Sequence, residues 1–118
     1  MATPNLANVA TIKPVFVSAA ITTGGAVNVT VPAESCYKIE SIYISNKDGT
    51  NTATASVYLS SDGGSSNQYL IHLVPVPPGS TVSLLDTPLY LDETDRISSE
   101  ASANGDLDIL ISGTELID

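Results

Sequence analysis

The chain is poor in aromatic, sulfur-containing and histidine side chains. It has no Trp, one Cys and one His among 118 residues, and aromatic residues make up only 5%. A single Cys excludes an intramolecular disulfide and a thiolate metal cluster within the chain. Any Ser–His–acid arrangement would depend entirely on His72, which no recognisable motif accompanies. We interpret Cys36 as a buried, inert thiol, and we expect neither an enzyme nor a cofactor.

Basic residues are also scarce, with four Lys and Arg against 13 Asp and Glu, which gives a net charge of −9. Such a surface repels nucleic-acid phosphates and anionic lipid head groups, so we expect no direct nucleic-acid or membrane partner. No apolar run approaches the roughly 18 residues of a spanning helix, and no signal peptide is recognisable. The acidic residues cluster in residues 86–118, where Arg96 is the only base. They form either a solvated face or a docking face for a basic partner.

Short alternations of apolar and small polar residues fill most of the chain. Val27, Val29 and Val31 alternate with Asn28 and Thr30, and a similar pattern recurs in residues 107–112. Strand side chains alternate between two faces, so each stretch predicts a strand with one buried face. About eight such strands are separated by Gly, Pro, Asp and Asn. This pattern is typical of an all-β fold, a single-domain antiparallel β-sandwich of jelly-roll or immunoglobulin-like type.

Three local signals refine this prediction. Asp48-Gly49 and Asn104-Gly105 each predict a hairpin turn. The apolar parity changes at Ser41, which indicates a bulge or a strand buried on both faces. Residues 1–13 show no period, so we expect an N-terminal arm there, lying along its own domain or a neighbouring subunit, and a β-sandwich domain over residues 14–118.

Candidate contact residues come from the arm, one strand and an acidic turn. They are Met1, Leu6, Tyr58, Asp92, Glu93 and Asp95. Tyr58 lies on the polar face of its strand, where it either anchors a subunit contact or packs at a sandwich rim. The acidic turn carries oxygen ligands that Ca²⁺ prefers, but it lacks the Gly and the carboxylate spacing of a known calcium loop. A turn that precedes a strand accounts for it adequately.

A family resemblance rests on three segments. Residues 31–46 read VPAESCYKIESIYISN, residues 89–97 read LYLDETDRI, and residues 106–113 read DLDILISG. These segments resemble the "VPAG" turn, the "IxSIxIxN" strand, the "LxLxxGDxI" turn and the final strand of small tailed-phage virion proteins. The resemblance covers roughly residues 26–115. Two departures stand out, because Glu34 and Thr94 occupy positions where that family usually has Gly.

The resemblance implies a structural protein that acts by contact on a virion, often as a trimer, without catalytic residues. We expect a capsid decoration or cement protein that binds other virion proteins, such as the major capsid protein, and is made in the host bacterial cytoplasm. The nearest alternative is a neck, tail, baseplate or fibre component. An alternative of another class is a carbohydrate-binding module, because jelly rolls commonly bind sugars.

Overall fold

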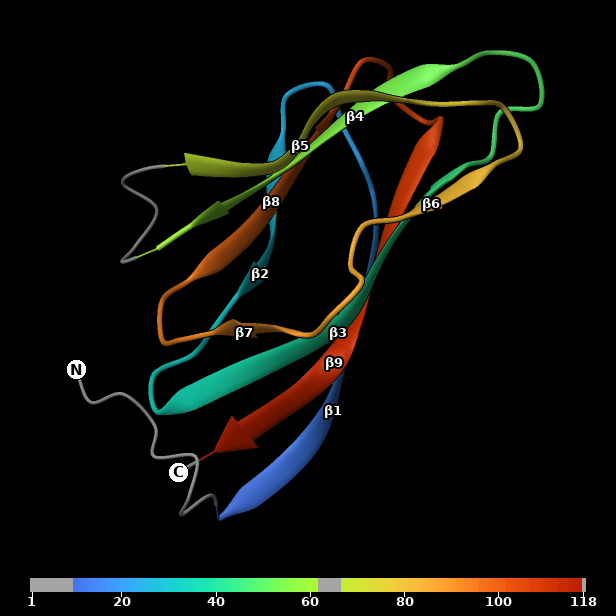
Figure 1. Cartoon of the computed structure of the whole chain (residues 1–118). Coiled ribbons are helices and arrows are strands. Elements are labelled where there is room, and N and C mark those ends of the chain that lie inside the picture. The colour runs from blue at the N-terminus through green and yellow to red at the C-terminus, as the bar shows by residue number, and fades with distance from the viewer. Residues whose placement is uncertain (1–9, 62–66, 118) are drawn as a thin grey trace.

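The computed structural model describes residues 10–61 and 67–117, which form nine strands in two antiparallel sheets (Figure 1). The strands are β1 (Thr11–Ala20), β2 (Ala26–Thr30), β3 (Ser35–Asn46), β4 (Ala53–Ser60), β5 (Asn67–Val76), β6 (Thr81–Ser83), β7 (Leu89–Leu91), β8 (Arg96–Ala101) and β9 (Leu107–Ile117). The described residues include no helix suited to crossing a membrane. The all-β sandwich prediction is confirmed.

The strand order is that of a jelly roll. Sheet A has the order β1-β9-β3, and β6 and β7 both pair with β3 at different residues. Sheet B has the order β2-β8-β4-β5. The pairs β1/β9, β2/β8, β3 with β6 and β7, and β4/β5 are nested, as in a long hairpin wrapped into two sheets. The observed order thus selects the jelly roll over the immunoglobulin-like alternative.

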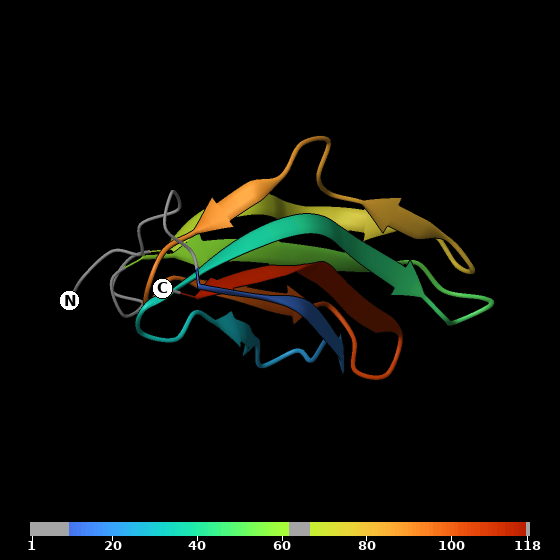
Figure 2. The ribbon, with the colours of Figure 1, turned by 90° about the horizontal axis from the view of Figure 1, so that it is seen from below.

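Two predicted hairpins are wrong. The Asp48-Gly49 turn connects β3 in sheet A to β4 in sheet B, and the Asn104-Gly105 turn connects β8 in sheet B to β9 in sheet A. Gly105 has the positive φ of a tight turn and Gly49 does not, and both connections carry the chain across the sandwich instead of closing a hairpin. Figure 2 shows the β3–β4 and β5–β6 connections at one end, with the β2–β3 and β7–β8 turns at the other.

A buried amide holds the β3–β4 end together. The Asn46 side chain is fully buried, and its Nδ2 donates to the carbonyl oxygens of Asn51 and Val76, each at 2.9 Å. Its Oδ1 accepts the Asp48 N–H at 2.9 Å. Asp48 in turn accepts the Thr50 N–H at 2.8 Å, and such bonds lower the pKa of its carboxyl. The loop therefore satisfies its polar groups internally.

The predicted boundary between the N-terminal arm (residues 1–13) and the β-sandwich domain (residues 14–118) needs a correction. Strand β1 begins at Thr11, which pairs with Ile117, so residues 11–13 belong to sheet A and not to an arm. Most of the predicted arm, with Met1 and Leu6, lies outside the described residues. In β2 a bulge at Asn28 breaks the predicted alternation, so Val29 is buried while Val27 is 50% exposed.

The core is built mainly from branched aliphatic residues of both sheets. The largest of its fully buried members are Ile21, Val31, Ile39, Ile42, Ile44, Val57, Val76, Ile97, Leu107, Ile109 and Ile111. No aromatic side chain is among the fully buried residues described. The scarcity of aromatic residues in the sequence is thus matched by a thin aliphatic core.

A bulge in β3 sets which of its residues face that core. Ile39 pairs with Gly113 and Ser41 pairs with Ser112, so Glu40 is the extra residue. The inward parity changes from Ile39 to Ile42 and Ile44, while Tyr43 is exposed. The bulge predicted near Ser41 is confirmed, and the alternative of a strand buried on both faces is wrong. Opposite the bulge the backbones come so close that a Cβ on Gly113 would overlap the Lys38 carbonyl oxygen.

We expect Gly113→Ala to destabilise the protein by about 3 kcal/mol or more, because the added carbon overlaps backbone that cannot move aside cheaply. Chemical unfolding followed by far-UV circular dichroism measures this loss. Gly49→Ala is the matched control, because nothing lies within 4 Å of its added Cβ and its φ is ordinary. Equal stabilities of the two variants would contradict the close approach.

Candidate interaction surfaces

The acidic turn at 92–95 uses its carboxylates within the turn. The Asp95 N–H donates to the Asp92 carbonyl oxygen at 3.2 Å, which closes a β-turn. The Asp92 N–H donates to Asp95 Oδ2 at 2.9 Å, and the Glu93 N–H donates to Asp92 Oδ1 at 2.7 Å. Across residues 10–61 and 67–117, no three His, Cys, Asp or Glu side chains gather as metal ligands. The arrangement is that of a well-bonded turn.

Glu93 links this turn to the turn between β2 and β3. Its side chain is buried, and its Oε2 accepts the N–H of Glu34. The backbones also pair, because the Thr94 N–H donates to the Val31 oxygen and the Val31 N–H donates to the Asp95 oxygen, each at 3.0 Å. Glu93 therefore points inward and fixes the end of the sandwich, whereas Asp92 is exposed at the surface.

Both departures from the phage pattern sit at left-handed backbone positions. Glu34 has a φ of 64° and Thr94 a φ of 66°, each at the third residue of its turn. Gly is the ordinary choice there because a side chain costs about 1 kcal/mol or more in this conformation. The turns at 32–35 and 92–95 keep the backbone geometry typical of Gly, because the hydrogen bonds between the two turns hold it.

Tyr58 lies in the middle of the outer face of sheet B. It pairs with Tyr69 of β5 and Ser98 of β8, and it is half-buried. Its ring centroid is 5.3 Å from that of Tyr69, and its hydroxyl would be 3.4 Å from a Cβ on Gly25. Burial, followed by the nearby Glu100 carboxylate, raises the pKa of Tyr58. Tyr58 thus packs flat across the sheet instead of projecting from it.

The aromatic cluster on sheet B continues to the edge strand β5. The Tyr69 ring lies 4.6 Å from the ring of His72, and Tyr69 is 52% exposed. Next to His72, Leu73 adopts a φ of 54° at a bulge, and its N–H donates to the buried Ser56 hydroxyl. His72 therefore belongs to an exposed, irregular edge and has a ring contact, without a partner set for catalysis in the described residues.

Sheet A carries the second group of exposed apolar side chains. Ile12 and Phe16 of β1 are 68% and 67% exposed, and Tyr43 and Tyr90 also reach solvent. Two ion pairs lie beside this face, with Lys38 Nζ 3.7 Å from Glu40 Oε1 and Lys47 Nζ 3.1 Å from Asp108 Oδ1. Sequence reasoning missed Ile12 and Phe16. One sequence signal could have indicated their exposure. Pro14 is typical of an edge strand, and residues 15–17 around Phe16 are apolar on both faces of that strand.

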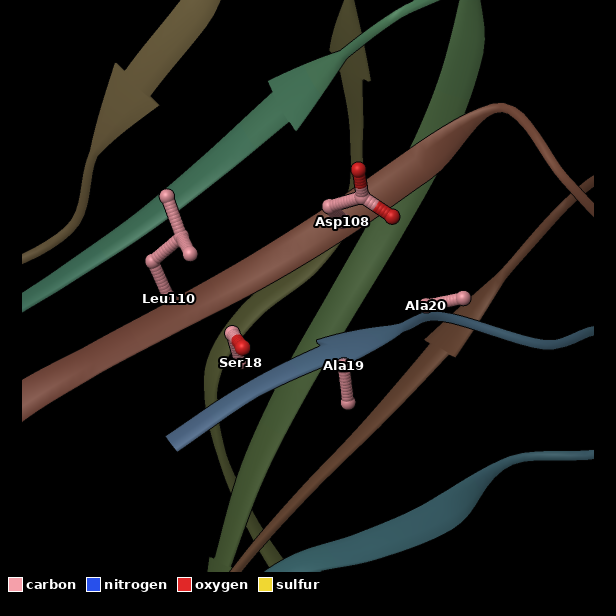
Figure 3. Close-up of a pocket in the computed structure, with 5 residues that line it drawn as sticks. All are labelled: Ser18, Ala19, Ala20, Asp108 and Leu110. Carbon is pink, nitrogen blue, oxygen red and sulfur yellow. The ribbon is translucent and has the colours of Figure 1, made fainter. Parts of the chain in front are cut away.

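A hollow lies beside the end of β1. Its volume is about 270 Å³, and Ser18, Ala19, Ala20, Asp108 and Leu110 line it (Figure 3). Ser18 and Ala19 point to opposite sides of the strand, as expected from the pleat (Figure 3). A second hollow of about 240 Å³, between β4, β5 and β7, is lined in part by Leu59, Leu89 and Tyr90. Each has a single carboxylate in its lining, from Asp108 and Asp95 respectively.

Known proteins share the architecture but not the sequence. No family model matches the chain, and no curated protein matches it. A chain of the capsid asymmetric unit of cyanophage Pam1 superposes with a TM-score of 0.51, 16% identity, and coverage of 100% of this chain and 93% of that one. A chain from Bacillus endospore appendages, a novel family of disulfide-linked pili, gives a TM-score of 0.53 and 16% identity, with 91% and 87% covered. At this identity the likeness establishes the shared fold.

We expect Thr94→Gly to stabilise the protein relative to a Thr→Gly change at an ordinary φ. Gly relieves the left-handed strain at position 94, while both changes add similar freedom to the unfolded chain. Thr87→Gly is the control, since Thr87 lies in an exposed bend without a positive φ. Thermal and urea unfolding should separate the two variants by about 1 kcal/mol. A more stable Thr87→Gly variant would contradict the turn geometry.

The Cys36 thiol provides a pH-dependent prediction. Burial, with smaller effects of Asp92 and Asp95, raises the pKa of Cys36 above its ordinary 9.0. The unfolded chain therefore loses this proton first, so the thiol's contribution to stability is complete below pH 9.0 and is lost as the pH rises through the folded pKa. An NMR titration of ¹³C-labelled Cys36 should show a midpoint above that of the urea-unfolded chain. Asp92→Asn should lower that midpoint without restoring the unfolded value, and a folded midpoint below 9.0 would contradict this environment.

Proposed function

We propose that this chain is a structural protein of a bacteriophage virion and acts by protein–protein contact. The observation that carries the proposal is the jelly-roll strand order combined with two exposed apolar surfaces on a strongly acidic body. The fold likeness to a chain of the cyanophage Pam1 capsid asymmetric unit supports it. The likeness to the endospore pilus chain supports a structural role more generally.

The surfaces are suited to binding and poorly suited to reaction chemistry. Large exposed side chains such as Phe16, Tyr69 and Tyr90 are the kind that anchor interfaces. Each described hollow combines Ser and a single Asp with aliphatic side chains, and neither lining contains a His, Cys or Lys. Contact is therefore the activity that these residues support.

Within the virion, we propose a capsid decoration protein that stabilises the head. Such a protein adds buried interface across joints between capsid subunits, where many copies around symmetry axes increase the effective affinity. The acidic residues keep single copies soluble before assembly. A neck, tail, baseplate or fibre position uses the same contact chemistry in fewer copies.

The number of copies per particle tests this assignment. Quantitative mass spectrometry of purified virions that encode the chain, with the major capsid protein as internal standard, should find copies in the hundreds, on the order expected for a symmetric shell. About three to a few dozen copies would move the protein to the neck, tail or fibre. Absence from the particle would contradict a virion role.

The carbohydrate-binding alternative is tested separately. The rings of Tyr58, Tyr69 and His72 are tilted to one another by 49° and 56°, so they do not form a flat stacking platform. We therefore expect no binding on a glycan array. Saturable binding that Tyr69→Ala removes, together with absence from virions, would favour the sugar-binding function.

A further inference from the structure

Strand β1 leaves an open edge on sheet A. It pairs with β9 on one side and is the end strand of the sheet in the described residues. The Ile21 N–H donates to the Leu107 oxygen at 2.9 Å and continues the register in which Ala19 pairs with Ile109. Antiparallel ladders repeat every two residues, so odd-numbered N–H groups of β1 point to β9 and even-numbered ones point to the open edge.

Pro14 divides this edge into two parts. It is even-numbered, so its missing N–H falls on the open side, where a proline is tolerated. A strand that paired along Pro14 would lose a hydrogen bond. The outward N–H groups of Phe16, Ser18 and Ala20, which have no backbone partner among residues 10–61 and 67–117, therefore form the continuous pairing segment of the edge.

The same segment carries both a protruding ring and a space for one. Phe16 is 67% exposed on the outer face of sheet A. Two and four residues further along, Ser18 and Ala20 are small, and with Asp108 and Leu110 they border the hollow of about 270 Å³ (Figure 3). This volume exceeds that of a phenyl ring.

Electrostatics also favour a self-contact here. The chain carries a net charge of −9, so two copies repel each other over most of their surfaces. Residues 14–21 contain no charged residue, and Asp108 beside them is paired with Lys47. This edge is a place where two acidic copies can approach without bringing unpaired carboxylates together.

We propose that a second copy of this chain docks on the β1 edge, through antiparallel pairing of Phe16–Ala20 around a two-fold axis at Ser18. This register places Phe16 of each copy opposite Ala20 of the other, so that each ring enters the partner's hollow. Pro14 lies outside the paired segment. A register centred on Phe16 would instead set Pro14 opposite Ser18 and bring the two rings together.

The contact is small and isologous, so it produces a weak dimer with a continuous sheet across the axis. It goes beyond the proposed function and does not depend on it. The dimer is measured on the purified chain, whereas the virion role is measured in particles. Either can therefore fail while the other stands.

Sedimentation velocity over a range of about 5 to 500 µM tests the proposal, because a small interface dissociates in this range. The full chain should shift from monomer to dimer with increasing concentration. Ser18→Pro removes the N–H donor at the two-fold axis and should weaken association at least about tenfold. The pairing of β1 with β9 is kept, because the N–H of residue 18 points away from β9. Ile12→Pro is the matched control, because it removes an outward N–H beyond Pro14, and it should dimerise as the wild type does.

Phe16→Ser provides a second test that leaves the backbone unchanged. Its side chain is exposed in the monomer, so the variant should keep the thermal midpoint of the wild type and lose most of the dimer. A wild-type chain that stays monomeric across the range would overturn the proposal. So would a dimer that both Ser18→Pro and Phe16→Ser leave intact, or one that forms equally weakly in the Ile12→Pro control and in Ser18→Pro.

Discussion

The pairing of β3 with β9 is the constraint on which the rest of the molecule depends. These two long strands form the centre of sheet A, and the Gly113 backbone accommodates the Glu40 bulge between them. The bulge turns Ile42 and Ile44 inward after Ile39, so one residue without a side chain permits a continuous core on both sides of it. All other strands of sheet A attach to this pair, with β1 on β9 and β6 and β7 on β3.

The two ends of the sandwich are closed by different chemistry. At one end a buried neutral amide, Asn46, satisfies three backbone groups, two in the β3–β4 loop and one at Val76. At the other end a buried carboxylate, Glu93, bridges two turns that have side chains where Gly would be less strained. Acidic residues in this chain therefore serve two purposes, because some solvate the surface and one organises a turn pair.

Sequence patterns predicted the fold class because alternation reports directly on burial in strands. The bulge near Ser41 was also predictable, since a parity change in residues 39–44 has few other causes. The destinations of the Asp48-Gly49 and Asn104-Gly105 turns were not, because a turn residue fixes local backbone and not the sheet that the next strand joins. For the contact surface, Tyr58 was anticipated but packs flat, and Phe16 was missed because exposure on an edge depends on strand order.

The neighbouring positions of β1 and β9 have a mechanical consequence. Thr11 is paired with Ile117, and the strands run antiparallel, so the described chain begins and ends at the same corner of sheet A. A pulling force applied at Thr11 and Ile117 would break the hydrogen bonds between β1 and β9 one after another, because these bonds lie along the direction of the force. A force that separates the two ends at this corner would peel β1 from β9, whereas a force along the strands would shear all the hydrogen bonds of the β3–β9 ladder at once.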